Sequence, residues 1–240
     1  RTGKVKEKQR AKDVFDLITT MAWKTGDPGL IFLDEINRRH SISHVGTIES
    51  TNPCGEVPLL PYESCNLGSI NLSKMVKDGD INWEKIKNIT RTGVHFLDNV
   101  IDANKYPLDE IDRETKNNRK IGLGVMGLAE MFAKLNIPYD SEEAVKTAEK
   151  IMKFIRDESV KKSVELGEKR GSFPNFKGSE WEKKYNNMRN ATVNTIAPTG
   201  TISIIANTSS GIEPIFALSF VRNVMGTQLL EINPVFENIA

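Results

Sequence analysis

Residues 52–69 read Asn52-Pro53-Cys54-Gly55-Glu56-Val57-Pro58-Leu59-Leu60-Pro61-Tyr62-Glu63-Ser64-Cys65-Asn66-Leu67-Gly68-Ser69, and they hold both cysteines of this 240-residue chain. An amide, Asn52, stands two positions before Cys54, and a carboxylate, Glu56, stands two positions after it. In an extended segment such positions point to one side, so we expect the three side chains to share one small volume. Three prolines and Gly55 favour a fixed irregular loop over a helix. A thiol, an amide and a carboxylate in one volume form a candidate reaction centre.

A second stretch is a candidate anion site. It reads Asn190-Ala191-Thr192-Val193-Asn194-Thr195-Ile196-Ala197-Pro198-Thr199-Gly200-Thr201-Ile202-Ser203. The pattern predicts a buried strand over residues 191–196, a sharp turn over residues 198–201, and then a helix. The N–H groups at a helix N-terminus attract phosphate, and Gly200 permits close approach of the backbone. The hydroxyl donors are those of Thr199, Thr201 and Ser203. Taken alone, the stretch is equally consistent with an ordinary turn.

Together the two stretches resemble the large, catalytic chain of ribonucleotide reductases. Asn-Pro-Cys-Gly-Glu followed by Ser-Cys-Asn-Leu-Gly-Ser-Ile-Asn-Leu is similar to the family's active-site finger loop, at about residues 50–66 here. The second stretch is similar to the family's loop for the substrate phosphates, at about residues 197–203. The motifs are independent and stand in the family's order. The resemblance covers nearly all of this chain but only part of the family's longer catalytic chains.

The resemblance implies radical chemistry on the substrate ribose. A thiyl radical on Cys54 would remove the 3′ hydrogen, and Glu56 would take the proton of the 3′-hydroxyl as a general base. Asn52 would orient the substrate hydroxyls, and the 2′-hydroxyl would leave as water. Cys65 would be one member of the redox thiol pair that supplies the reducing equivalents. The implied substrate-binding residues are Asn52, Pro53, Cys54, Gly55, Glu56, Pro198, Thr199, Gly200, Thr201 and Ile202.

The spacing of the two cysteines points to a subtype. Cys54 and Cys65 are 11 positions apart (65 − 54), which resembles the adenosylcobalamin-dependent, class II enzymes more than the class I enzymes with a metal-containing partner subunit. The implied cofactor is adenosylcobalamin, and the implied reductant is an external dithiol such as thioredoxin. The substrate would be a ribonucleoside diphosphate or triphosphate. The family places the redox partner of Cys65 upstream of this chain, so the remaining segments of the catalytic chain are implied partners. A homodimer stays open.

Composition excludes several classes of protein. The 33 basic and 32 acidic side chains give a net charge of +1, which gives no support for a nucleic-acid surface. No apolar run reaches the ~18 residues of a membrane span, and the N-terminus lacks the apolar stretch of a signal peptide. Two cysteines do not make a secreted disulfide framework. We therefore expect a cytoplasmic protein with no membrane or nucleic-acid partner. The chain starts without Met and stops partway into a predicted helix, so we expect a piece of a longer polypeptide.

Apolar periodicity predicts alternating helices and strands along the rest of the chain. Amphipathic helices are expected over residues 6–24, 82–104 and 141–166. A short apolar run predicts a buried strand over residues 30–33. Alternation of apolar with small or polar residues predicts a second strand over residues 67–72. For the first helix, the inner side would carry Val14, Leu17, Ile18 and Met21. The inner stripe of the second helix would be Ile86, Ile89, Val94, Leu97, Val100 and Ile101, and that of the third would be Val145, Ala148, Ile151, Met152, Ile155 and Ser159. Asp140 and Glu143 have the spacing of a capping box before the last helix.

One glycine motif suggests a different function. Gly122, Gly124 and Gly127 match the Gly-x-Gly-x-x-Gly fingerprint of dinucleotide-binding folds. That fingerprint requires an acidic residue about 20 positions on, at the end of a strand, but residues 140–143 begin a helix here. We therefore favour a strand that packs tightly on the following helix.

Two histidines have metal-binding spacing. His40 and His44 are four positions apart, which allows chelation on a helix. No third ligand is apparent, and Arg38 and Arg39 place positive charge beside them. We therefore expect exposed loop histidines and no metal site.

The implied fold is α/β: part of the family's ten-stranded α/β barrel, with the finger loop threading its middle. Residues 1–240 would then form a partial catalytic barrel domain, although periodicity alone supports only mixed helices and strands. The leading hypothesis is an incomplete segment of an enzyme that reduces ribonucleotides to 2′-deoxyribonucleotides. The alternative is a non-catalytic nucleotide-phosphate-binding or structural module that needs a complementing chain. Half a barrel would expose strand edges and apolar faces, so we expect the segment to be inactive alone.

Overall fold

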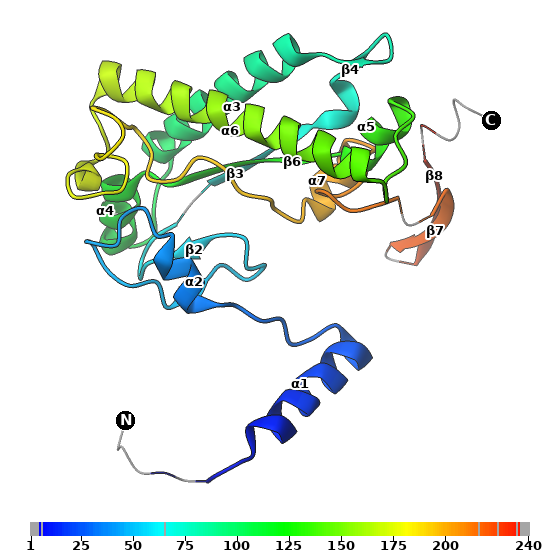
Figure 1. Cartoon of the computed structure of the whole chain (residues 1–240), viewed down its shortest axis with the longest axis horizontal. Helices are drawn as coiled ribbons and strands as arrows, with labels where there is room; N and C mark the ends of the chain where they lie inside the picture. The colour runs from blue at the N-terminus through cyan, green and yellow to red at the C-terminus, as the bar shows by residue number, and fades with distance from the viewer. Residues whose placement is uncertain are drawn as a thin grey trace.

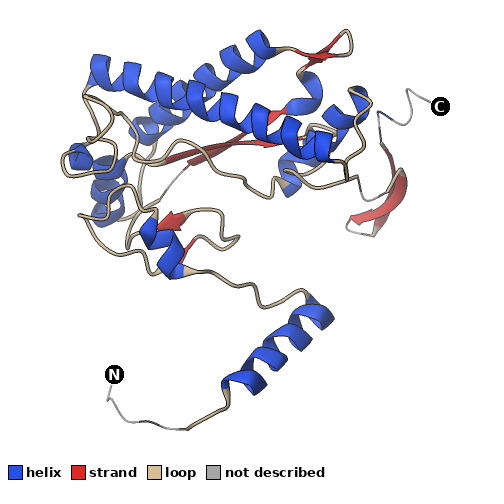
Figure 2. Cartoon of the chain, viewed as in Figure 1, coloured by secondary structure: helices blue, strands red, loops and turns tan. Residues whose placement is uncertain are grey.

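The computed structural model describes residues 5, 7–64, 66–215, 217–224, 226–233 and 235. Helices and strands are mixed along the chain, as the periodicity predicts (Figure 2). The elements in chain order are α1 (Ala11–Thr25), α2 (Leu33–Arg38), β1 (Ser50–Thr51), β2 (Pro58–Leu59), β3 (Asn66–Asn71), the 3-10 helix η1 (Leu72–Lys74), β4 (Val76–Lys77), β5 (Asp80–Ile81), α3 (Trp83–Ala103), α4 (Asp109–Asn118), β6 (Ile121–Met126), α5 (Leu128–Lys134), α6 (Glu142–Arg170), the 3-10 helix η2 (Pro174–Phe176), α7 (Gly200–Ile205), β7 (Ser219–Val224) and β8 (Thr227–Ile232).

A parallel pair of strands, β3 and β6, lies at the centre of the fold. The six residues of β3 pair with β6 from Asn66 opposite Ile121 to Asn71 opposite Met126. The long helices α3 and α6 run beside each other over this pair (Figure 1). All six residues of β6 are buried, which is typical of a parallel strand covered on both faces. The predicted strand over residues 67–72 and the helix over residues 82–104 are confirmed within one or two residues.

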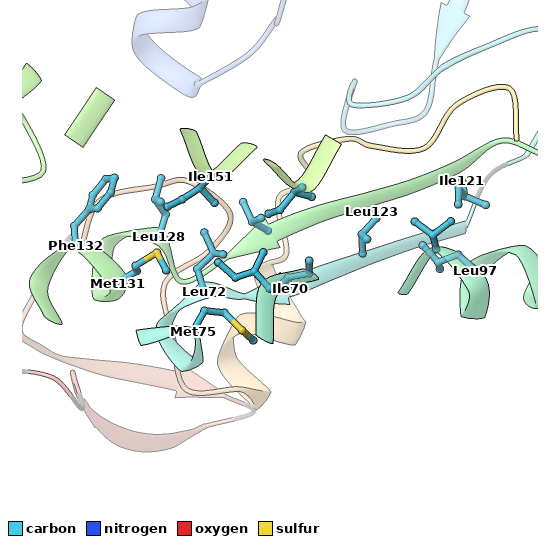
Figure 3. Packing of buried hydrophobic residues seen from close by; sticks show 14 of the residues in the cluster. Ile70, Leu72, Met75, Leu97, Ile121, Leu123, Leu128, Met131, Phe132 and Ile151 are labelled. Atoms are coloured by element: carbon cyan, nitrogen blue, oxygen red, sulfur yellow. The ribbon is translucent and has the colours of Figure 1, made fainter. Parts of the chain in front are cut away.

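The main hydrophobic core fills the space between the strand pair and the helices α3, α5 and α6 (Figure 3). Full burial of one Leu, Ile or Phe side chain contributes roughly 1.5–3 kcal/mol, so this cluster is the largest stabilising feature of the fold. It fixes the end of β6 and the start of α5 relative to each other. Its labelled members are Ile70, Leu72, Met75, Leu97, Ile121, Leu123, Leu128, Met131, Phe132 and Ile151.

A second, smaller core lies under the segment that carries Cys54. It joins residues from the loop after α2, the end of β2, α6 and residues 188–193. The cluster holds the base of the Cys54 segment against the rest of the fold. Its buried members are Ile42, Ile48, Leu60, Val160, Phe173, Met188, Ala191 and Val193.

The expected strand over residues 191–196 is extended but is not a regular strand. It lies parallel to β6, and its one ladder position is an isolated bridge between Leu123 and Asn194. Ile121 N–H donates to Thr192 O, whereas Leu123 N–H donates to Val193 O. The two donors on β6 are two positions apart, whereas the two acceptors in the 191–196 segment are adjacent. This one-residue shift in register interrupts the ladder.

The predicted strand over residues 30–33 is wrong. Leu33 begins α2, and the residues before it form an exposed connection, with Phe32 71% exposed. A short apolar run becomes a strand only where a neighbouring strand accepts its backbone hydrogen bonds, and no described strand pairs with this run.

The first predicted helix is present as α1, and Gly26 ends it in the left-handed region at φ 82°. It begins at Ala11, several residues later than expected. Its predicted inner side is not covered, because none of its residues is buried and Leu17 is 61% exposed. Figure 1 shows α1 lying apart from the main body of the chain.

The helix α6 is capped by Ser141 rather than by the expected capping box at Asp140. The Ser141 hydroxyl accepts a hydrogen bond from Ala144 N–H at 3.1 Å. Val145, expected on the inner side, is 69% exposed, whereas Ile151 and Ile155 of the same stripe are buried. On α3, Ile89 is likewise 40% exposed although the stripe predicted it to point inward.

The described residues do not form a closed barrel. Their strands make four two-stranded sheets, of which only the β3–β6 pair is parallel. The last pair, β7 and β8, is an antiparallel hairpin near the C-terminal end (Figure 1).

Candidate active site

Cys54 lies at the turn of a short hairpin formed by residues 50–59, which we call the Cys54 hairpin. Its strands pair Ser50 with Leu59 and Thr51 with Pro58. Asn52 N–H donates to Val57 O at 3.1 Å, and Gly55 N–H donates to Asn52 O at 3.0 Å. Gly55 has φ 84°, a conformation that costs a non-glycine residue energy. The residues around Cys54 therefore form a tight turn, and the extended segment expected here is wrong.

The turn nevertheless brings the predicted amide and carboxylate together. Asn52 Nδ2 donates to Glu56 Oε2 at 2.5 Å, and Asn52 Oδ1 accepts from Val57 N–H at 2.9 Å. Asn52 and Glu56 are half-buried, whereas Cys54 is exposed with a free thiol. The amide fixes the orientation of the carboxylate, and Cys54 is exposed in the same turn. Cys65, the second predicted redox residue, lies outside the described residues.

A buried ion pair supports the base of the Cys54 hairpin. Lys120 Nζ lies 2.6 Å from Glu63 Oε2, and the two side chains are 2% and 1% exposed. Glu63 also accepts from Leu60 N–H and from Asn118 Nδ2, each at 2.6 Å. Lys120 Nζ further approaches Pro58 O at 3.5 Å. This pair joins the residue before β6 to the chain just after β2, and the motif analysis did not single it out.

The residues 197–203 form a turn followed by α7, as expected. Thr199 is the N-cap of α7 and adopts the left-handed region at φ 58°, and no side chain caps the first turn. Pro198, Gly200, Thr201 and Ile202 are exposed. A Cβ added to Gly200 would have no atom within 4 Å, so the space in front of it is open. Uncapped first-turn N–H groups facing open space suit a small anion.

Two of the predicted hydroxyl donors already have partners within the protein. Thr199 Oγ1 accepts from Gly211 N–H at 2.7 Å. Ser203 Oγ donates to Gly200 O at 3.0 Å and lies 2.9 Å from Ser210 Oγ. These contacts hold the turn in place, which leaves the exposed backbone and Thr201 to face a ligand.

Thr195 links the two predicted motifs. Its Oγ1 donates to Glu56 O at 2.7 Å, so the strand-like segment that leads into the 197–203 turn is bonded directly to the Cys54 hairpin. Thr195 lies 139 positions from Glu56 in the sequence. Motif analysis missed this role because a single threonine in an extended run carries no local signal.

The glycine motif of β6 serves close packing, but its partner is the 191–196 segment and not the following helix that was expected. A Cβ on Gly124 would lie 2.2 Å from Thr195 O, and one on Gly122 would lie 2.6 Å from Thr195 Cγ2. Gly127 ends the strand at φ 72° before α5. Glycines at these positions allow the 191–196 segment to lie directly against β6, with no side chain between the two backbones.

The expectation for His40 is wrong, because it is buried, whereas His44 is exposed as expected. Desolvation, with the positive charge of Lys120, lowers the pKa of His40 to about 4, and the nearby Gly46 carbonyl opposes this shift. Neither ring nitrogen has a hydrogen-bond partner of good geometry among the described residues. His40 lines the same pocket as Lys120 and as Ile48, Ala191 and Val193 of the second core.

A charged network anchors the helices behind the site. Asp98 of α3 is fully buried and accepts from Arg119 Nε at 3.0 Å and from Asn190 Nδ2 at 3.1 Å. Arg119 also bonds Asp102 at 2.7 Å. This hydrogen bond holds the pKa of Asp102 below its ordinary value, and burial acts in the opposite direction. The network joins α3, the end of α4 and the residue before the 191–196 segment.

The described part of the chain contains neither a metal-binding cluster nor a membrane-spanning helix. No group of three His, Cys, Asp or Glu side chains there is arranged to hold a metal ion. None of the helices there combines the length and the apolarity needed to cross a membrane.

Comparison with known proteins identifies the family. The family model for the ribonucleotide reductase barrel domain matches residues 1–188 and 183–239. A vitamin B12-dependent ribonucleoside-diphosphate reductase of Thermoplasma acidophilum is 61% identical over 99% of this chain, and one of Mycobacterium tuberculosis is 52% identical over all of it. The chain covers 31% and 34% of those two proteins. A ribonucleoside-diphosphate reductase subunit alpha of Chlamydia pneumoniae is 31% identical over 90% of the chain and is covered to 25%. The chain therefore spans about a third or less of the length of these relatives, and it belongs to the ribonucleotide reductase barrel-domain family.

Proposed function

We propose that this chain is a segment of the catalytic chain of a vitamin B12-dependent ribonucleotide reductase. The observation that carries the proposal is the bonded path from the Cys54 hairpin to the 197–203 turn. Asn52 holds Glu56 within the turn that carries Cys54, and Thr195 bonds the same hairpin to the segment that leads into Thr199. A ribonucleotide spanning the two motifs would place its ribose at the hairpin and its phosphates at the N-terminus of α7.

The residues of the hairpin would divide the chemistry between them. A thiyl radical on Cys54 removes the 3′ hydrogen of the ribose and becomes a thiol. Glu56 takes the proton of the 3′-hydroxyl, and the Asn52 amide keeps the carboxylate in place for that transfer. The 2′-hydroxyl leaves as water. Cys65 and a partner cysteine supply two electrons and two protons as they form a disulfide; one proton completes the leaving water, the other is added at the 2′ carbon, and Glu56 returns its proton to the 3′ oxygen. Cys54 then returns a hydrogen atom to the 3′ carbon.

The initiating radical fits adenosylcobalamin, because the relatives at 61% and 52% identity are named as vitamin B12-dependent. When bound, this cofactor supplies a carbon-centred radical by homolysis of its cobalt–carbon bond. The exposed thiol of Cys54 fits such a partner, since it is open at the tip of the hairpin.

The remaining parts of the proposal follow from the family. The β3–β6 pair and the 191–196 segment would be three neighbouring strands of a ten-stranded barrel, with the Cys54 hairpin at its middle. A thioredoxin-like dithiol would reduce the disulfide of Cys65, and the substrate would be a ribonucleoside diphosphate or triphosphate. Cytoplasmic location and assembly as a homodimer belong to the same proposal. The competing function is a non-catalytic nucleotide-phosphate-binding module that needs a complementing chain.

The test is ribonucleotide reduction with a dithiol, in the presence and absence of adenosylcobalamin. It compares the chain alone, the chain assembled with the segments that complete its relatives, and that assembly carrying Cys54→Ser or Glu56→Gln. We expect cobalamin-dependent turnover in the wild-type assembly only. Turnover that requires a metal-containing subunit instead would contradict the B12 assignment. Nucleotide binding without turnover under either condition would favour the binding-module function.

A further inference from the structure

A buried carboxylate on α5 binds a segment that lies far from it in the sequence. Glu130 is 1% exposed. Its Oε1 accepts from Ser209 N–H at 2.9 Å, and its Oε2 accepts from Ser209 Oγ at 2.5 Å and from Thr208 Oγ1 at 3.1 Å. Asn233 Nδ2 approaches Oε1 at 3.2 Å. Bonds from several donors to one buried carboxylate are charge-assisted and stronger than neutral hydrogen bonds.

The turn before α5 holds Ser209 from its other side. Gly127 N–H donates to Ser209 O at 2.9 Å, so the carbonyl of Ser209 is bonded to the β6–α5 connection while its N–H is bonded to Glu130 of α5. A Cβ on Gly127 would lie 2.4 Å from Thr208 Oγ1. The glycine thus lets residues 208–209 approach closely enough for Glu130 to reach them.

The segment held by Glu130 in turn fixes the 197–203 turn. Thr208 N–H donates to Ser203 O at 3.0 Å, and Ser210 Oγ lies 2.9 Å from Ser203 Oγ. Gly211 N–H donates to Thr199 Oγ1 at 2.7 Å. Residues 208–211 therefore contact both the N-cap and the first turn of α7.

Thr199 needs such support because its backbone is in the left-handed region, at φ 58°. This conformation is unfavourable for an ordinary L-residue, and it persists where the surroundings hold it. The bond from Gly211 to the Thr199 side chain holds the residue from outside its own helix. Without it, the first-turn N–H groups of α7 would lose their fixed direction.

We propose that Glu130 is a positioning residue for the substrate phosphates. Through Ser209 and residues 210–211 it keeps Thr199 and the uncapped first turn of α7 in the conformation that receives a diphosphate group. This inference rests on the proposed function, since it concerns the same phosphate site. Glu130 itself touches no substrate, because its oxygens face residues 208, 209 and 233.

The test is Glu130→Gln in the chain assembled with the segments that complete its relatives. A glutamine keeps the size of the side chain, but its NH2 group replaces an oxygen that accepts hydrogen bonds from residues 208 and 209. We expect KM for the ribonucleoside diphosphate to rise roughly tenfold to hundredfold, with kcat at saturation little changed. The inhibition constant of inorganic pyrophosphate, a probe without ribose or base, should rise by the same factor. Glu168→Gln, at an exposed position of α6, is the matched control and should leave both constants unchanged.

A second variant, with a smaller structural change, tests the inference if Glu130→Gln fails to fold. Ser209→Ala removes one bond to Glu130 at a partly exposed position, so it should raise the same two constants by a smaller factor, and the double variant should add little to Glu130→Gln. Unchanged pyrophosphate inhibition in either correctly folded variant overturns the inference, even if the melting temperature falls. If the wild-type assembly reduces nucleotides and the variants match it, only this inference fails. If the wild type neither binds pyrophosphate nor reduces nucleotides, the proposed function fails and this inference fails with it.

Discussion

Removing one partner of the buried Lys120–Glu63 pair should destabilise the fold strongly. Lys120→Met leaves a carboxylate that is 1% exposed and keeps only the bonds from Leu60 N–H and Asn118 Nδ2. Breaking a buried pair by removing one partner costs about 3–5 kcal/mol, because the remaining charge stays desolvated without its counter-charge. With a urea m-value of about 3 kcal/mol/M, the unfolding midpoint should fall by roughly 1–2 M.

The assay is equilibrium urea unfolding of the wild type, Lys120→Met, Glu63→Gln and the double variant, followed by circular dichroism. The double variant leaves no unpaired charge, so we expect it to recover about 1.5 kcal/mol or more relative to the sum of the single changes. Lys116→Met removes an exposed lysine whose bridge to Asp112 is solvated, and this control should cost less than about 1 kcal/mol. A loss below about 1 kcal/mol for Lys120→Met, or strictly additive effects, would refute the reasoning.

Three further predictions test the packing around the site. Because the pKa of His40 is lowered to about 4, the unfolded chain binds more protons than the folded chain between about pH 4 and 6.5. The contribution of His40 to the free energy of unfolding is therefore complete above about pH 6.5 and is lost as the pH falls to about 4. His40→Gln should therefore flatten the pH dependence of unfolding by about 3 kcal/mol across that range, while His44→Gln should leave it intact. Gly124→Ala forces a methyl group onto the carbonyl of Thr195 and should lower stability by about 1–3 kcal/mol in thermal unfolding, whereas Gly29→Ala, with nothing within 4 Å, should change little. Thr195→Val removes the bond to the Cys54 hairpin; we expect a stability loss of about 1 kcal/mol but a clearly larger drop in kcat/KM of the assembled enzyme, and equal small losses would argue against a link between the motifs.

Motif spacing predicted the composition of the candidate site but not its geometry. Asn52 and Glu56 lie together, yet they do so through a hairpin turn with Gly55 at its tip rather than along an extended segment. The turn conformation depends on the pairing of β1 with β2, and no single residue type predicts that pairing. The 197–203 turn and its helix could be predicted because proline, glycine and threonine restrict the local backbone.

Local patterns failed where a distant contact decides the outcome. The apolar residues 30–33 have no partner strand and form no strand, and the slip between residues 192 and 193 breaks the ladder expected beside β6. The lowered pKa of His40 depends on burial and on the charge of Lys120, which lies 80 positions along the chain. Periodicity identifies which face of an element is apolar, but it does not show whether another element covers that face.

The sequence by itself determined the family, the three amphipathic helices and the identity of the residues around Cys54, because these depend on residue type and short spacing. The tertiary structure alone decided which distant residues support them. Thr195 reaches Glu56 across 139 positions, Lys120 reaches Glu63 across 57, and Glu130 reaches Ser209 across 79. Each of these contacts joins segments that meet only after β3, β6 and the helices have packed. The energy of such contacts depends on distance in space and on burial, and neither quantity can be predicted from the neighbouring residues in the sequence.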